Sequence, residues 1–381
     1  MTRSLAVTVA AATFACISQP TDPLVQVDCR YGRITPSQDV PTCLYSQSVI
    51  SQADRDSAAH TIASMFSLRD SFATDTSQAA FNKAAELIRA LQHVADFYSR
   101  REFNDSARFH RMMDHLLVTK EYVRGTTIRY VGGRAWPAAT PWLSWQYYAN
   151  NGIYFQPVNT IQLVVYIVPH LYPTTDSILQ MAEPIYRYAL WRQSAGRRFP
   201  VWEYDFPWNS GGVSVQAPWT SGMAQGMALD LFTEAYHRTG NPIWRNRAYQ
   251  VLNSFLVSWN DGGVLLPDTS HGYWWEEYHP TVQVWNGSVI ALISVGYFAK
   301  VMGDSAAQRM FDSGIQAVKF YTPFYDTGTW TLYSRTQGYN SIAYHGLCVR
   351  LMDQLYVMTG DPYFQTVADR WRSYVPPPGV Y

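Results

Sequence analysis

Residues 236–242 read Y-H-R-T-G-N-P, and a similar pattern, Y-V-M-T-G-D-P, returns at residues 356–362, with a weaker copy, V-M-G-D-S, at residues 301–305. In each copy a Gly that can end a helix precedes an Asn or Asp that can cap the next one, and Pro suits a first helical turn. The helices before these turns carry apolar stripes: Met223, Met227, Leu231 and Ala235 in one, Leu347, Leu351 and Leu355 in another. One helical hairpin therefore repeats roughly every 60 residues.

Repeated helical hairpins decide the fold class. Stacked hairpins of this kind close into an α/α toroid, and the loops at one end of the ring form a cleft. The sequence predicts a mainly α fold, an incomplete (α/α) toroid or barrel of stacked helical hairpins with a small N-terminal irregular and β-hairpin portion. From Pro157 onward the chain reads as helix after helix.

The first part of the chain is less regular. Prolines break any periodicity between residues 20 and 50, a helical pattern covers residues 52–101, and T-I-R-Y-V at 127–131 predicts a short β-hairpin or a loop. We divide the chain into a signal peptide at 1–18, an N-terminal region at 19–155 and a toroidal domain at 156–381.

The N-terminus resembles a secretory signal peptide, because Arg3 precedes about ten apolar residues and small residues near Ala15. The run is too short for a membrane-spanning helix, although it would also suit a buried segment. We expect a secreted or otherwise exported protein with no membrane span. Export would permit a disulfide between Cys29 and Cys43, leaving Cys348 as an isolated thiol.

Composition excludes some classes of partner. The chain has 29 Lys and Arg against 29 Asp and Glu, so no global field steers a nucleic acid toward it, and no nucleic-acid partner is expected. Hydrophobic residues make up 47% of the chain, which indicates a globular protein. The 27 Tyr and 14 Trp are typical of carbohydrate-active proteins and equally of aromatic helical cores.

The segment 272–287, G-Y-W-W-E-E-Y-H-P-T-V-Q-V-W-N-G, is the strongest candidate for chemistry. Glu276 and Glu277 lie among bulky aromatic residues, and burial against apolar rings can raise the pKa of a Glu toward the pH at which it works as a general acid or base. Aromatic faces beside hydrogen-bonding groups also suit the apolar face of a sugar. The structural alternative is an aromatic core beside an exposed pair of carboxylates.

Three further segments lie near predicted helix starts: P-W-T-S-G-M-A-Q-G at 218–226, Y-D-T-G at 325–328 with Tyr333 and Arg335, and A-Y-H at 343–345. The small residues of the first let backbones approach closely. The 9 His are scattered with no H-E-x-x-H pair or Cys/His cluster, and no Gly-rich phosphate loop or G-x-S-x-G signature occurs, so we expect neither a metal nor a cofactor.

These segments together resemble the D-glucuronyl C5-epimerases, which invert C5 of glucuronate within heparosan-type polysaccharides. The resemblance lies in M-A-Q-G, in W-E-E-Y-H-P followed by Asn286-Gly287, in Y-D-T-G, in Tyr344-His345 and in R-W-R-S-Y at 370–374. It covers roughly residues 199–374, with a weaker echo at 152–157. Between 156 and 199 the chain is too short for the β-sandwich of the animal enzymes, and Tyr333-Ser334-Arg335 is one residue shorter than the family's Tyr-Asp-Leu-Arg.

The resemblance implies an α/α-toroid catalytic domain and metal-independent epimerisation, with Glu277 and Tyr344 as the acid/base pair. It also implies a uronic-acid-containing polysaccharide as partner and a homodimer as a possible assembly. The predicted catalytic residues are Glu277, Tyr344, Tyr278 and Tyr333. The predicted substrate-binding residues are Arg335, Glu276, His345, Trp275, Asn286, Trp219, Gln225 and Tyr154.

Three other functions remain open from the residues. A polysaccharide lyase begins with the same removal of the C5 proton and then expels the C4 substituent. A glycoside hydrolase would pair Glu277 with a second carboxylate, for which Glu203, Asp205 and Asp326 are available. A non-catalytic glycan-binding protein would keep the aromatic platform without needing Glu277.

Overall fold

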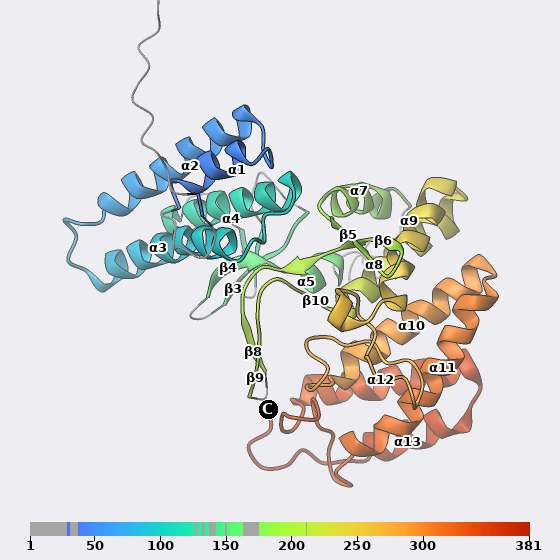
Figure 1. The fold of residues 1–381 in the computed structure, drawn as a ribbon. Helices are drawn as coiled ribbons and strands as arrows, with labels where there is room; N and C mark the ends of the chain where they lie inside the picture. Colours follow the sequence, from blue (N-terminus) through green and yellow to red (C-terminus); the bar gives the residue numbers. More distant parts are fainter. Residues whose placement is uncertain are drawn as a thin grey trace, which may run out of the picture.

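The computed structural model describes residues 29–30, 37–125, 129–131, 134–136, 142–148, 151–162, 175–210 and 212–381. The predicted mainly α fold is confirmed (Figure 1). The helices are α1 (Val40–Ser46), α2 (Gln52–Asp70), α3 (Gln78–Ser99), α4 (Ser106–Arg124), α5 (Pro157–Gln162), α7 (Thr175–Arg187), α8 (Gly222–Thr239), α9 (Pro242–Leu252), α10 (Trp285–Met302), α11 (Ser305–Tyr321), α12 (Ile342–Thr359) and α13 (Pro362–Arg372), with short 3-10 turns η2 (Asn253–Leu256), η3 (Trp259–Asp261) and η4 (Thr322–Tyr325). The predicted signal peptide, 1–18, lies outside the described residues.

Helices α1 to α4 form a group at one end of the molecule, with their own hydrophobic cluster that includes Leu87, Phe109 and Leu116. The helical pattern predicted over 52–101 is confirmed as two helices, α2 and α3. The expectation of an irregular chain between 20 and 50 is wrong at α1. Proline is tolerated in a first helical turn, and α1 begins with Val40 and Pro41.

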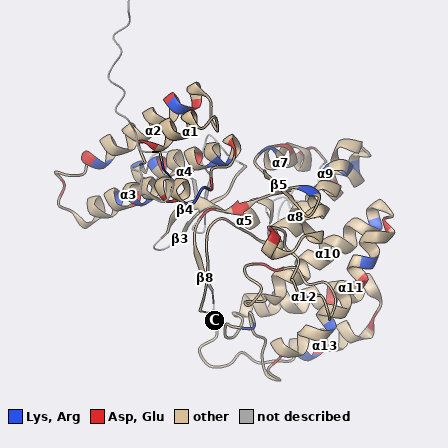
Figure 2. Ribbon diagram, viewed as in Figure 1, with Lys and Arg blue, Asp and Glu red and all other residues tan. Residues whose placement is uncertain are grey.

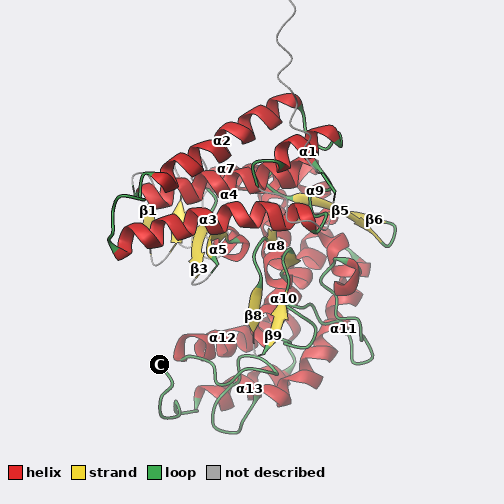
Figure 3. Cartoon of the chain, turned by 60° about the vertical axis from the view of Figure 1, so that its left-hand side comes forward, coloured by secondary structure: helices red, strands yellow, loops and turns green. Residues whose placement is uncertain are grey.

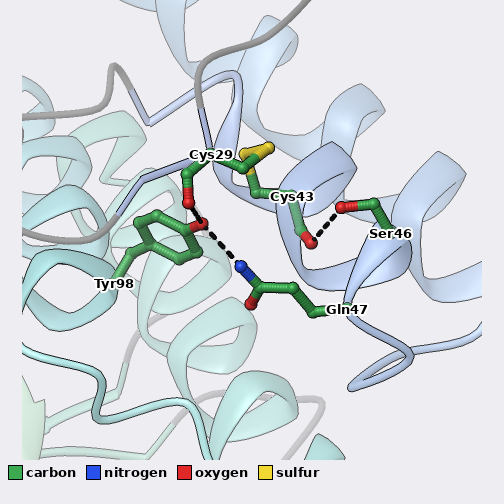
Figure 4. Close-up of a disulfide and its surroundings, with 5 residues drawn as sticks. All are labelled: Cys29, Cys43, Ser46, Gln47 and Tyr98. Carbon is green, nitrogen blue, oxygen red and sulfur yellow. Dashed lines mark hydrogen bonds between the residues drawn. A yellow bond between two sulfur atoms is a disulfide. The ribbon is translucent and has the colours of Figure 1, made fainter.

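The predicted disulfide between Cys29 and Cys43 is present and attaches the chain before α1 to that helix (Figure 4). The Tyr98 hydroxyl of α3 donates to the Cys29 carbonyl at 2.6 Å, and Gln47 Nε2 donates to the Tyr98 oxygen at 3.0 Å. The bridge and these bonds therefore tie α1 to α3. Cys348 is a free, buried thiol, as predicted.

Strands take up more of the chain than the sequence predicted. The part of the hairpin predicted at 127–131 that is described forms β1 (Arg129–Val131) paired with β2 (Arg134–Trp136), in an antiparallel sheet completed by β3 (Trp145–Tyr148) and β4 (Gly152–Phe155). The expectation of helix after helix beyond Pro157 is wrong between 190 and 220. Three two-stranded ribbons lie there: β5 (Leu190–Ser194) with β6 (Arg197–Val201), β7 (Glu203–Tyr204) with β10 (Trp219–Thr220), and β8 (Trp208–Ser210) with β9 (Val213–Val215).

The turn between β5 and β6 gives the local reason for the first ribbon. Ala195 and Gly196 both have positive φ, 48° and 71°. Positive φ at both central residues is the pattern of a two-residue turn whose twist matches that of the strands it joins. The chain therefore reverses within two residues, which no helix allows.

The repeated hairpins are confirmed residue by residue. Gly240, Gly303 and Gly360 end α8, α10 and α12 in the left-handed conformation, with φ of 64°, 63° and 67°. The side chains of Asn241, Asp304 and Asp361 then accept backbone N–H groups at the starts of α9, α11 and α13. The second and third hairpins lie at the end of the molecule away from α1 to α4 (Figures 1 and 3), and the first hairpin adjoins them where α8 packs against α10. Their closure into a toroid stays a prediction.

The small-residue run at 218–226 brings α8 against α10, as predicted. A Cβ on Gly226 would lie 2.8 Å from the Ala291 Cα, so only glycine allows these backbones so close. Helix α10 is apolar and long enough to cross a membrane by length and composition, but 78% of it is buried. Among the described residues it is therefore a core helix that the neighbouring hairpins cover.

A buried ionic network joins the N-terminal helices to the ribbons. Glu203 of β7 is fully buried, and its carboxylate accepts from Arg108 of α4 at 2.6 Å and from Arg192 of β5 at 2.6 Å. Burial alone would raise the pKa of Glu203, but Arg192 and Arg108 hold it below its usual value. Elsewhere the charged residues are scattered over both ends of the molecule (Figure 2). The division at residue 155 stays a prediction, and this network crosses it.

Glu203→Gln should lower the free energy of unfolding by about 3 to 5 kcal/mol, because it leaves two arginines near a buried neutral group. Urea unfolding followed by circular dichroism measures the change. The matched control is Asp56→Asn, which breaks an exposed pair with Arg55 and should change stability by less than about 1 kcal/mol. Equal midpoints for the two variants would contradict a stabilising role for the network.

Candidate active site

A cavity of about 520 Å³ lies where the sheet, the ribbons and the starts of α8, α10 and α12 meet. Both predicted regions of the chain contribute to it. Its walls are formed by Gln146, Tyr148, Gln156, Val158, Asn159, Gln162, Tyr204, Phe206, Trp208, Trp219, Met223, Glu277, Tyr278, Asn286, Ala343, Tyr344, Leu347 and Arg350. Of the predicted site residues, the structure brings together Glu277, Tyr278, Tyr344, Asn286 and Trp219 at this cavity.

Aromatic rings form one wall of the cavity. Tyr204 and Trp219 stack with ring centroids 4.0 Å apart and planes at 2°, and Tyr278 meets Trp219 edge-on at 5.5 Å. Trp219 Nε1 donates to the Phe206 carbonyl at 2.8 Å, which fixes the indole. Rigid flat faces beside amide and hydroxyl groups suit the ring of a sugar.

Backbone hydrogen bonds hold the residues before Glu277 in place. The Trp274 carbonyl accepts from Leu266 N at 2.7 Å, and Glu276 N donates to the Val264 carbonyl at 2.8 Å. The Glu276 carbonyl accepts from Gly222 N at 2.6 Å, so it satisfies one of the unpaired N–H groups at the start of α8.

The start of α10 holds the same segment from the other side. Ser288 Oγ donates to the Trp275 carbonyl at 2.7 Å. Residues 275 and 276 are thus held between the first turns of α8 and α10, and Glu277 follows directly.

Glu277 lies over a glycine. A Cβ on Gly287 would lie only 2.2 Å from Glu277 Oε2, so no other residue fits there without moving the carboxylate. Glu277 is 7% exposed, and its Oε2 has no hydrogen-bond partner in the described part of the chain. Burial raises the pKa of Glu277 to about 7, and the Tyr278 hydroxyl acts weakly in the opposite direction. At neutral pH this carboxyl can therefore either accept or donate a proton.

Glu276 is placed differently from its neighbour. It is fully buried, it is not one of the residues that line the cavity, and neither carboxyl oxygen has a partner among the described residues. Burial, and then the charge of Glu277, raise the pKa of Glu276 well above its usual value. This shift favours the neutral form of Glu276, and the geometry gives its side chain no place in the lining of this cavity.

Tyrosines extend from Glu277 toward α12. The hydroxyls of Tyr278 and Tyr333 lie 2.9 Å apart, and the Tyr333 ring meets the Tyr344 ring edge-on at 5.5 Å. Burial, and then the charge of Glu277, raise the pKa of both Tyr278 and Tyr333, so both stay protonated at neutral pH. Tyr344 is 45% exposed at the start of α12, where its phenol can reach a ligand.

Several residues predicted to bind substrate have structural partners instead. Trp275 is buried and donates through Nε1 to the Phe255 carbonyl. Gln225 is buried and donates to the Pro200 carbonyl and to Ser254 Oγ. His345 stacks on Trp330 and contacts the Thr331 hydroxyl and the Trp371 carbonyl through its two ring nitrogens. None of the three is among the residues lining the cavity.

Two other predicted substrate contacts also lie elsewhere. Arg335 is exposed, with its guanidinium 4.4 Å from the Phe324 ring centroid and 3.4 Å from Gln283 Oε1. Tyr154 lines a separate cavity of about 460 Å³, on the α3 side of the sheet. Asn286 does line the main cavity, and its Oδ1 accepts from Gly287 N at 2.8 Å.

Sequence reasoning missed Arg350, the one Lys or Arg among the residues that line the described cavity. The spacing of residues in the sequence could have pointed to Arg350. Ala343, Leu347 and Arg350 follow a spacing of four and then three residues, which places them on the same face of α12. Within the described residues, no group of three or more His, Cys, Asp or Glu side chains is placed to hold a metal ion.

Comparison with known proteins gives one family match and several relatives. The family model described as D-glucuronyl C5-epimerase C-terminus matches residues 196–373. An uncharacterised protein of Methanocaldococcus jannaschii is 28% identical over 180 residues, which are 46% of this chain and 58% of that protein. The D-glucuronyl C5-epimerase of Caenorhabditis elegans is 27% identical over 177 residues, 41% of this chain and 29% of the nematode protein.

The chain thus spans little more than half of the archaeal relative and under a third of the nematode one. The matched region contains Glu277, Tyr278, Tyr333 and Tyr344, together with the three helical hairpins. Residues 196–373 of this chain are thus similar to the C-terminal region of the D-glucuronyl C5-epimerase family.

Proposed function

We propose that this protein is a uronate C5-epimerase that converts D-glucuronate to L-iduronate within a heparosan-type polysaccharide. The observation that carries the proposal is Glu277, a buried carboxyl with a pKa of about 7 in an aromatic-walled cavity that also contains Tyr344. Similarity to this family indicates an isomerase-type enzyme. The polysaccharide and the roles of the residues belong to the proposal.

The chemistry needs two proton-transfer groups on opposite faces of the sugar. Glu277 takes the C5 proton, and the electron pair left at C5 spreads onto the neighbouring carboxylate as an enolate. Tyr344 then donates its hydroxyl proton to the other face of C5, which inverts the centre and leaves a phenolate. Proton exchange with solvent returns Glu277 and Tyr344 to their starting forms. No atom of the substrate other than the C5 hydrogen is replaced.

The arrangement of the tyrosines supports this division of roles. Glu277 comes from the loop before α10 and Tyr344 from the first turn of α12, so the two groups reach the cavity from different elements. Tyr278 lines the cavity, and its hydroxyl is hydrogen-bonded to that of Tyr333, so the Tyr278 phenol is held where it can donate to negative charge that develops on the substrate.

The position of the other carboxylates argues against a hydrolase. Glu203 is bound by Arg108 and Arg192, Asp205 by Arg111, and Asp326 by Arg370. Of the described residues that line the cavity, Glu277 alone carries a carboxylate. A lyase shares the first step of the epimerase and is separated from it by its product.

Export from the cell and a dimeric assembly are further parts of the proposal. The disulfide between Cys29 and Cys43 supports export, because such bridges persist mainly in oxidising compartments. The dimer stays a prediction.

The first test is NMR of heparosan incubated with the protein in deuterated water. We expect deuterium at C5 together with iduronate signals, and Glu277→Gln should reduce both by a factor of about 10³, since general base catalysis contributes on that scale. Unsaturated uronate would make the protein a lyase, and shortened chains without unsaturation a hydrolase. Binding without any exchange would leave a glycan-binding protein.

The rate of deuterium incorporation should rise with pH through about 7. Glu277 must be ionised to remove the proton, so kcat/KM should fall about tenfold for each pH unit below its pKa. The profile should be the same from glucuronate or from iduronate, because their interconversion releases no net proton. A rate that is flat between pH 5 and 7 would assign the base to another group.

Gly287→Ala should displace the Glu277 carboxylate, because the new methyl group would overlap it. A shift of about 1 Å can reduce a rate about 100-fold, so we expect a loss of that size with α10 still folded. Gly338→Ala is the control, since no atom lies within 4 Å of a Cβ there. Equal rates for the two variants would show that the position of Glu277 is not critical.

A further inference from the structure

Glu277 and Arg350 are the one acidic and the one basic side chain among the described residues that line the cavity. Arg350 lies on the exposed surface of α12. In the described part of the chain, no carboxylate lies within ion-pair distance of its guanidinium. A cation without a partner at the wall of a polar cavity is available for an anionic ligand.

The position of Arg350 on α12 relates it to the proposed proton donor. Arg350 follows Tyr344 by six residues, which is a rise of about 9 Å along a helix. It shares a face of α12 with Ala343 and Leu347, which also line the cavity. Tyr344 and Arg350 therefore both reach the cavity from α12, within two turns of one another.

Arg350 is not serving as the counter-ion of Glu277. The pKa of Glu277 is set by burial and by the Tyr278 hydroxyl. The charge of Arg350 is therefore left for a bound molecule. Arg335, which the family resemblance assigned to this part of the chemistry, lies on Phe324 away from the cavity lining.

We propose that Arg350 binds a uronate carboxylate of the polysaccharide and is a substrate-binding residue of this site. The inference rests on the proposed function for the identity of the substrate. A guanidinium presents two parallel N–H donors that match the two oxygens of a carboxylate. When the carboxylate belongs to the reacting residue, its charge increases as the C5 proton leaves, so the same contact strengthens in the transition state.

The carboxylate has two sources, the reacting uronate or a neighbouring uronate of the same polymer. The kinetic constants separate them. Loss of a contact to the reacting residue lowers kcat, because that contact strengthens in the transition state. Loss of a contact to a neighbour raises KM with kcat unchanged.

The test compares Arg350→Gln with the wild-type protein by C5 deuterium incorporation into heparosan. We expect kcat/KM to fall about 100-fold, the scale seen when one preorganised donor is removed, and Arg350→Lys to recover part of it because a single ammonium keeps the charge but not the fork. Arg309→Gln, on α11 and outside the cavity, is the matched control for losing one exposed arginine. Thermal unfolding should be the same for all variants.

Calorimetric binding separates failure of this inference from failure of the proposed function. Wild-type protein should bind heparosan oligosaccharides more tightly than carboxyl-reduced ones, and Arg350→Gln should remove the difference even if no C5 exchange occurs. Wild-type activity that Arg350→Gln leaves intact would overturn the assignment. So would a larger loss in Arg335→Gln, or a wild-type protein that binds both oligosaccharides equally.

Discussion

The hydrogen bonds that hold residues 275 and 276 between the first turns of α8 and α10 position the whole candidate site. A helix start exposes N–H groups that need partners, and here the Glu276 carbonyl supplies one to Gly222. A Cβ on Gly222 would lie 2.6 Å from that same oxygen. The same contacts therefore set both the close approach of α8 to α10 and the position of Glu277. Small residues at the helix starts make these contacts possible.

This arrangement has a cost in stability. A carboxyl with a pKa of about 7 instead of its usual value near 4.3 has a charged form that is less stable by about 4 kcal/mol. Because the pKa values of Glu276 and Glu277 are raised in the folded protein, the folded state loses stability as pH rises from their unfolded pKa values toward and above 7. The surrounding aromatic core offsets that loss, which is consistent with a site kept for function.

The ends and starts of the helices were predictable from the sequence, but the directions in which side chains point were not. Gly240 and Asn241 specify a helix end and a helix start through their own backbone preferences, so the hairpins were found. His345 follows Tyr344 directly, yet it points into the core and stacks on Trp330. Consecutive residues of a helix point to different sides, so one motif can contain both a residue that lines the cavity and a residue that is buried in the core. Arg350 was missed because it lies outside every motif.

The family motifs at the C-terminal end illustrate how structural residues support the site. Asp326 of Y-D-T-G accepts from Trp371 Nε1 at 2.9 Å and from the Tyr374 hydroxyl at 2.7 Å, so it joins R-W-R-S-Y to the loop before α12. That loop carries Tyr333, whose hydroxyl meets Tyr278. Helix α13 contributes no residue to the cavity lining, but it anchors the loop that orders the tyrosines. The last hairpin therefore fixes the tyrosine side of the site, as α8 and α10 fix the glutamate side.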